Sequence, residues 1–130
     1  MDFVLVHGSY HGGWCWELLV PELERLGHRA IAVDLPISEP RAGGQDYADA
    51  VVDAAAGLAE PILVGHSMGG LVIPLVPAAR PVRRLIFLAA FLPIPGVSIN
   101  EPLAPRVIAT AQTGRIIPAP PAELPATTSL

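Results

Sequence analysis

No lysine occurs in these 130 residues and cysteine occurs once, and each scarcity excludes a class of protein. The eight cationic residues are arginines spread along a chain of net charge −4, so there is no basic stripe to bind nucleic acid. Cys15 alone can form neither an intrachain disulfide nor a zinc cluster, which favours a cytoplasmic setting. The apolar runs are too short to span a membrane, and the N-terminus has no basic stretch typical of a signal peptide.

Short apolar runs alternate with segments of helical character along the first 90 residues. Such near-continuous runs are typical of parallel strands that are covered on both faces. The predicted strands are Phe3–Val6, Ala30–Asp34, Ile62–Val64 and Arg84–Ala90. The predicted helices cover residues 14–26, with a bend at Pro21, residues 46–59 and a short or kinked segment from about Met68. This alternation implies right-handed crossovers, and it predicts an α/β protein with a three-layer α/β/α, doubly wound, mostly parallel sheet of about four strands.

The motif G-H-S-M-G at residues 65–69 follows the third predicted strand and precedes a predicted helix. A G-x-S-x-G motif in that position indicates a nucleophile elbow. Its glycines are needed because strand and helix pass so close that a side chain would clash. The turn exposes the Ser67 hydroxyl at a helix N-terminus, where backbone N–H groups favour negative charge. A small residue in a tight turn is the alternative interpretation of Ser67, and the paired glycines favour the nucleophile.

No histidine follows Ser67 in the sequence. A serine nucleophile needs a general base, usually histidine, and a group that orients this base. Every histidine and every aspartate precedes Ser67, and the only carboxylate side chains after it are Glu101 and Glu123. A catalytic triad in the order Ser, Asp, His therefore cannot be completed within these residues.

Two separated motifs, FVLVHGSYHGGW at residues 3–14 and GHSMGG at residues 65–70, together resemble the α/β-hydrolase superfamily. More narrowly, they resemble the branch that contains plant methylesterases, hydroxynitrile lyases and related bacterial esterases. The resemblance extends over about residues 3–105. It implies that the second and third strands flank the first, so that the loop at residues 7–13 faces the elbow across the switch point of the sheet.

The resemblance also implies a set of site residues. The backbone N–H groups of Met68 and Ser9 would form the oxyanion hole for the substrate carbonyl. Gly8 lets the loop approach closely, and because hydroxynitrile lyases typically carry threonine there, glycine favours ester hydrolysis. Gly8, His11 and His66 are the candidate substrate-binding residues. A serine nucleophile argues against dehalogenases and epoxide hydrolases, which use aspartate, and neither a metal nor an organic cofactor is implied.

Structural roles compete with chemical ones at several of these positions. His66 is more readily interpreted as a packing residue at the elbow than as a base, whereas His11 is either a substrate contact or a structural residue. His7 and Asp34 are expected to brace loops through hydrogen bonds. Core packing is predicted for the large and sulfur-bearing side chains at the start of the first helix, Trp14, Cys15 and Trp16.

Together these features predict a serine hydrolase of carboxylesterase type that acts on a small carboxylic ester through an acyl-enzyme. The chain is expected to be the truncated N-terminal part of a hydrolase of about 250–300 residues and inactive by itself. A hydroxynitrile lyase on the same fold, or a non-catalytic ligand-binding or partner-dependent fragment, are the alternatives. We expect a hydrolase core over residues 1–92, the start of a cap over residues 93–117 and a proline-rich irregular tail over residues 118–130. The open edge of the fourth strand would be covered by a homo-oligomer or a partner chain.

Overall fold

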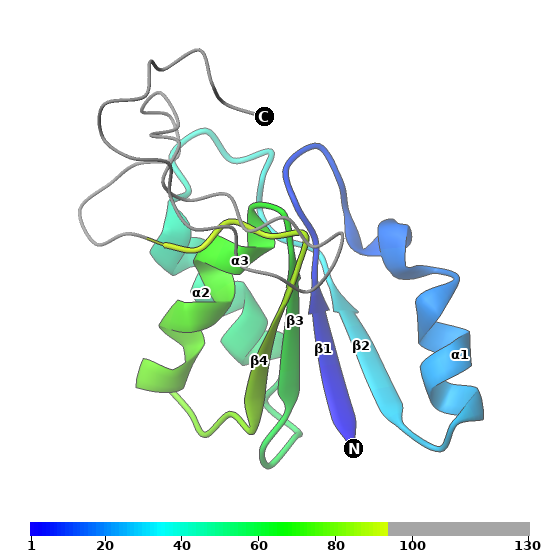
Figure 1. The fold of residues 1–130 in the computed structure, drawn as a ribbon. Coiled ribbons are helices and arrows are strands. Elements are labelled where there is room, and N and C mark those ends of the chain that lie inside the picture. Colours follow the sequence, from blue (N-terminus) through cyan, green and yellow to red (C-terminus); the bar gives the residue numbers. More distant parts are fainter. Residues whose placement is uncertain (94–130) are drawn as a thin grey trace, which may run out of the picture.

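The computed structural model describes residues 1–93 of the chain, which form a four-stranded parallel sheet (Figure 1). The strands are β1 (Asp2–Val6), β2 (Arg29–Val33), β3 (Ile62–His66) and β4 (Arg84–Leu88). Their order is β2-β1-β3-β4, and all three neighbouring pairs are parallel. This arrangement confirms the predicted fold class and the predicted placement of the second and third strands on either side of the first.

Helices cover both faces of the sheet, as the prediction of three layers requires (Figure 1). They are η1 (Gly13–Trp16), α1 (Leu19–Arg25), α2 (Gly44–Ala54), α3 (Gly69–Val72) and η2 (Ile73–Ala78), where η denotes a 3-10 helix. One face of β1 packs Val4 and Val6 into the core shared with α2, α3 and η2, and its other face packs Leu5 against Trp16. The apolar run of the first strand therefore reflects burial on both sides.

The single helix predicted over residues 14–26 is wrong, because the chain forms η1 and α1 with a break between them. Pro21 is the third residue of α1. The proline ring would clash with the carbonyl four residues earlier, at Glu17, so α1 cannot begin before the break. Pro21 fits in the first turn, because an N–H group at this position would have no acceptor within the helix.

The helix predicted over residues 46–59 is shifted towards the N-terminus and covers Gly44–Ala54. It begins earlier because the Asp46 carboxylate accepts a hydrogen bond of 2.7 Å from the N–H of Gly43, which caps the first turn. It ends earlier because the Leu58 N–H donates to the Ala55 carbonyl in a tight turn and the Arg80 guanidinium donates to the carbonyls of Ala55 and Leu58, so the carbonyls after α2 find partners without a further helical turn.

β4 lies at the edge of the sheet, and β3 is its only strand neighbour within residues 1–93. Leu85 and Phe87 pack against the core on the side of α2 and α3, whereas Ile86 and Leu88 on the opposite face remain 37% and 43% exposed. The expected open apolar edge is thus present in this part of the chain. The predicted cap start and the proline-rich tail fall outside the described residues. None of the described helices is long and apolar enough to cross a membrane.

Candidate active site

Ser67 occupies the turn between β3 and α3 in a strained conformation. Its φ of +52° lies in the left-handed region, which non-glycine residues seldom adopt. The Ser67 carbonyl accepts hydrogen bonds from the N–H groups of Gly70 (3.1 Å) and Phe91 (3.0 Å), and its own N–H donates to the Leu88 carbonyl (3.4 Å). The helix and the segment after β4 therefore hold the strained turn from two sides, and the Ser67 side chain stays half-buried at the surface of the turn.

The glycines of the motif lie where backbone meets backbone. A Cβ atom on Gly65 would lie 2.6 Å from the carbonyl oxygen of Gly69, and one on Gly69 would lie 2.6 Å from that of Val6. Real Cβ atoms do not approach so closely, so a side chain at either position would push α3 away from the sheet. This close approach of strand and helix is the physical reason for the two-residue spacing of each glycine from Ser67.

The loop after β1 touches the elbow from the neighbouring strand. A Cβ atom on Gly8 would lie 2.8 Å from the Cβ and 3.4 Å from the Oγ of Ser67. Ser9 follows this contact directly, and Met68 is the N-cap of α3. Within residues 1–93, the backbone N–H groups of Ser9 and Met68 donate to no protein acceptor. In this part of the chain, two backbone N–H groups without a protein acceptor therefore lie on either side of the serine.

His7 and Asp34 brace this loop, as the sequence predicts. The buried His7 ring accepts a 3.0 Å hydrogen bond at Nε2 from the N–H of Leu35, so its Nδ1 carries the proton and donates to the Gly8 carbonyl at 2.8 Å. The Asp34 carboxylate accepts a 2.7 Å hydrogen bond from the N–H of Gly13. Both ends of the loop are thus tied to the segment that follows β2.

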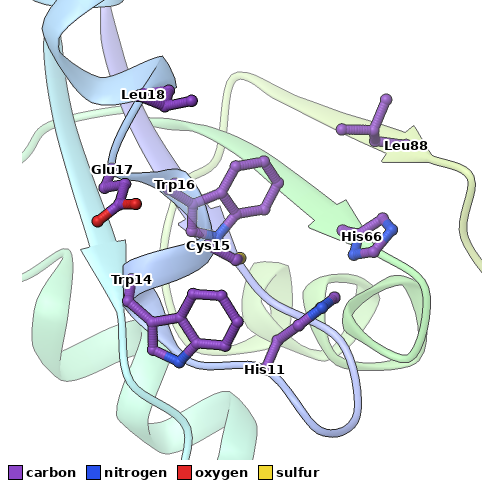
Figure 2. Close-up of a pocket in the computed structure, with 8 residues that line it drawn as sticks. All are labelled: His11, Trp14, Cys15, Trp16, Glu17, Leu18, His66 and Leu88. Carbon is purple, nitrogen blue, oxygen red and sulfur yellow. The ribbon is translucent and has the colours of Figure 1, made fainter.

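A cavity of about 390 Å³ lies beside the elbow (Figure 2). Within it the rings of His11 and His66 stack, with their centroids 5.6 Å apart. Burial lowers the pKa of His66, and the neighbouring His11 lowers it further. Burial also raises the pKa of the half-buried Cys15 thiol. The cavity is lined by His11, Trp14, Cys15, Trp16, Glu17, Leu18, His66 and Leu88.

The predicted site residues thus fall into two neighbouring groups. Gly8, Ser9, Ser67 and Met68 surround the elbow, whereas His11 and His66 lie on the wall of the cavity. Within residues 1–93 the Ser67 hydroxyl has no hydrogen bond to any histidine ring. No group of three metal-ligating side chains comes together in this part of the chain either.

Some residues of the cavity have no signal in the sequence, and one aromatic residue lies elsewhere than predicted. Core packing is confirmed for Trp16, which is 6% exposed, but it is wrong for Trp14, which is 63% exposed at the mouth of the cavity. The difference arises because two residues that are two positions apart on one helical turn point to different sides, so Trp16 faces the core and Trp14 points outward. Leu88, the last residue of β4, also lines the cavity, although the sequence predicts only a strand residue there.

The lowered pKa of His66 predicts a pH-dependent stability. The unfolded chain, with a pKa near 6.5, binds the proton more tightly than the folded chain does. The contribution of His66 to the free energy of unfolding is therefore fully present above about pH 6.5 and is lost as the pH falls through the lowered pKa of the folded chain. In urea unfolding at about pH 7.5 and about pH 5, the wild type should lose more stability than His66→Gln. His28→Gln serves as the control, and parallel losses in the wild type and His66→Gln would contradict the expectation.

Comparisons with known proteins agree with this geometry. The model of the alpha/beta hydrolase family matches residues 3–129. Esterase PIR7B of rice (Oryza sativa subsp. japonica) is 36% identical over an alignment of 128 residues, and the alignment covers 88% of this chain and 48% of the rice protein. The alpha-hydroxynitrile lyase of Arabidopsis thaliana is 42% identical over an alignment of 103 residues, and the alignment covers 70% of this chain and 40% of that protein. The crystal structure of a pyrethroid hydrolase from Sphingobium faniae matches with a TM-score of 0.64 and 34% identity, over 75% of this chain and 43% of the other. The chain thus spans less than half the length of these relatives.

Proposed function

The chain belongs to the alpha/beta hydrolase family, and from this premise we propose that it carries the nucleophile half of a serine carboxylesterase site. The observation that carries the proposal is the strained Ser67, with a φ of +52°, against which the loop at Gly8 packs. The neighbouring N–H groups of Ser9 and Met68, uncommitted within residues 1–93, support it. Similarity to a rice esterase and a bacterial pyrethroid hydrolase supports the reaction class.

In the proposed reaction the Ser67 Oγ attacks the carbonyl carbon of a small carboxylic ester, and its proton passes to a general base. The carbonyl oxygen becomes an oxyanion that accepts hydrogen bonds from the Ser9 and Met68 N–H groups. Loss of one such donor typically costs about 3–4 kcal/mol of transition-state stabilisation. When the intermediate collapses, the bond to the alkoxide oxygen breaks, and this oxygen takes the proton back from the base and leaves as the alcohol. Water then attacks the acyl-serine and releases the acid.

The general base is the part of the proposal that these residues do not supply. Both ring nitrogens of His7 are committed to hydrogen bonds, and His28 bonds to the terminal amine of Met1. His11 and His66 stack on each other in the cavity. We therefore propose that the 130-residue chain does not turn over esters until an imidazole reaches Ser67 from outside the described residues.

The relative named as a hydroxynitrile lyase makes cyanohydrin cleavage the second candidate. Gly8 disfavours it, because such lyases typically carry threonine at this position, directly against the serine, and glycine has no hydroxyl group to offer the substrate. Mandelonitrile cleavage and ester cleavage, measured with the same preparation and the same added imidazole, separate the two activities.

The proposed acyl-enzyme can be detected directly by mass spectrometry. We expect that treatment with p-nitrophenyl acetate and excess imidazole leaves an acetyl group on the peptide that contains Ser67, because imidazole takes the proton that the missing base would take. The exposed hydroxyl of Tyr10 provides an internal measure of unspecific acetylation. Acetylation of Tyr10 with an unmodified Ser67 peptide would count against the nucleophile assignment.

A further inference from the structure

A second contact between the loop at residues 7–13 and the elbow lies on the wall of the cavity. The His11 ring stacks on the His66 ring, with centroids 5.6 Å apart and ring planes at 29° (Figure 2). His66 directly precedes Ser67, and His11 is two residues after Ser9. The stack therefore joins the segment that carries the proposed nucleophile to the segment that carries one proposed oxyanion donor.

Two indole rings complete this contact. The Trp14 ring meets His11 edge-on at 5.4 Å, and the Trp16 ring meets His66 edge-on at 6.3 Å (Figure 2). Edge-to-face ring pairs stabilise a structure beyond the burial of their area. Trp16 is also buried against Leu5 and Val64. The four rings therefore link the loop to the apolar cluster that these residues form on one face of the sheet.

The stack is stable only while at least one imidazole is neutral. Two protonated rings would place like charges on stacked neighbours in a partly buried site. A protonated His11 would also carry an N–H at the buried Nδ1, which has no acceptor within residues 1–93. The other titratable groups at the cavity are Cys15 on η1 and the exposed Glu17 after it, whereas β4 contributes the uncharged Leu88. In the described part of the chain no carboxylate pairs with either ring.

We propose that His11 is a positioning residue whose stack on His66 holds the Ser9 N–H beside Ser67, and that protonation of both rings releases the loop. The inference rests on the proposed function only in assigning an oxyanion to the Ser9 N–H. The stack and its release are properties of the fold and can be measured without any catalysis.

The test follows the Ser9 and Met68 amides of the whole 130-residue chain by NMR from about pH 8 to about pH 5. In the wild type, the chemical shift of the Ser9 amide should change at acidic pH, when the second of the two stacked rings, His11 and His66, becomes protonated. In His11→Ala, the chemical shift of the Ser9 amide should differ from that of the wild type already at neutral pH, because the ring contact that positions the loop is lost. His11→Phe keeps a ring without a charge, so it should keep the neutral-pH shift of Ser9 but lose the acidic step.

His28→Phe is the matched control, because His28 lies at the start of β2, at the other end of the sheet, and contacts Phe3 and the Met1 amine. His28→Phe should leave the chemical shifts of the Ser9 and Met68 amides unchanged. An unaltered Ser9 amide in His11→Ala, or an acidic Ser9 step that persists in His11→Phe, would overturn the proposal. If Ser67 fails to become acetylated while the Ser9 amide behaves as expected, the proposed function falls and the positioning role stands.

Discussion

The purified 130-residue chain is expected to cleave p-nitrophenyl acetate no faster than its Ser67→Ala variant. A serine hydroxyl at its ordinary pKa is a poor nucleophile, and loss of the base from a serine triad alone lowers kcat on the order of 10⁶-fold. Each of the four histidines has another contact in the structure: hydrogen bonds hold His7 and His28, and ring stacking holds His11 and His66. The measurement is the initial rate of p-nitrophenol release from matched preparations of the two chains.

The control for this comparison is cooperative urea unfolding of both chains, which shows that the sheet is intact. A clear rate that depends on Ser67 would contradict the proposal and would require a base within the chain. His66→Gln and His11→Phe would then identify it, because only one of them would abolish the serine-dependent rate.

The second large effect concerns the close approach of strand and helix at the elbow. Gly69→Ala should destabilise the chain by about 2–3 kcal/mol, because the new Cβ would lie 2.6 Å from the Val6 carbonyl oxygen and 3.0 Å from that of His7. Both obstacles are backbone atoms, so relief requires α3 to move away from β1. The measurement is urea unfolding followed by the fluorescence of Trp14 and Trp16.

Gly57→Ala is the matched control for the glycine substitution. A Cβ at Gly57 would meet no atom within 4 Å, so alanine there should be neutral or stabilise the chain by up to about 1 kcal/mol through the unfolded state. Equal stabilities of the two alanine variants would show that the elbow tolerates a wider separation of strand and helix than the structure has.

Much of the fold could be predicted from local patterns. Four apolar runs mark the four strands, because β1 and β3 are buried along most of their length and β2 and β4 pack apolar side chains against the same cores. The G-x-S-x-G motif locates the turn because only glycine fits where β3 meets α3. The strand order came from the family resemblance. The hydrogen bonds of His7 and Asp34 follow from placing a polar side chain at the end of a buried strand, where loop N–H groups need acceptors.

The remainder depends on contacts between segments that are distant in the sequence. The shift of α2 depends in part on Arg80, which lies far along the chain and takes the carbonyls of Ala55 and Leu58. The break between η1 and α1 has a local signal in Pro21, which predicts a bend in the helix; the structure has a full break before it, because the proline ring would clash with the carbonyl of Glu17. The stacking of His11 on His66 has no local signal, because it exists only once β1 and β3 are neighbours.

The initial rate of p-nitrophenyl acetate cleavage, measured against imidazole concentration for the wild type and Ser67→Ala, tests the account most directly. The quantity of interest is the difference between the two chains, since it removes the cleavage that imidazole performs alone. We predict that the difference is zero without imidazole and grows with the concentration of neutral imidazole. Added imidazole would then act as the general base for the proposed nucleophile and oxyanion hole. A difference that stays at zero at every concentration would contradict the assignment of Ser67, and one already present without imidazole would contradict the absence of a base.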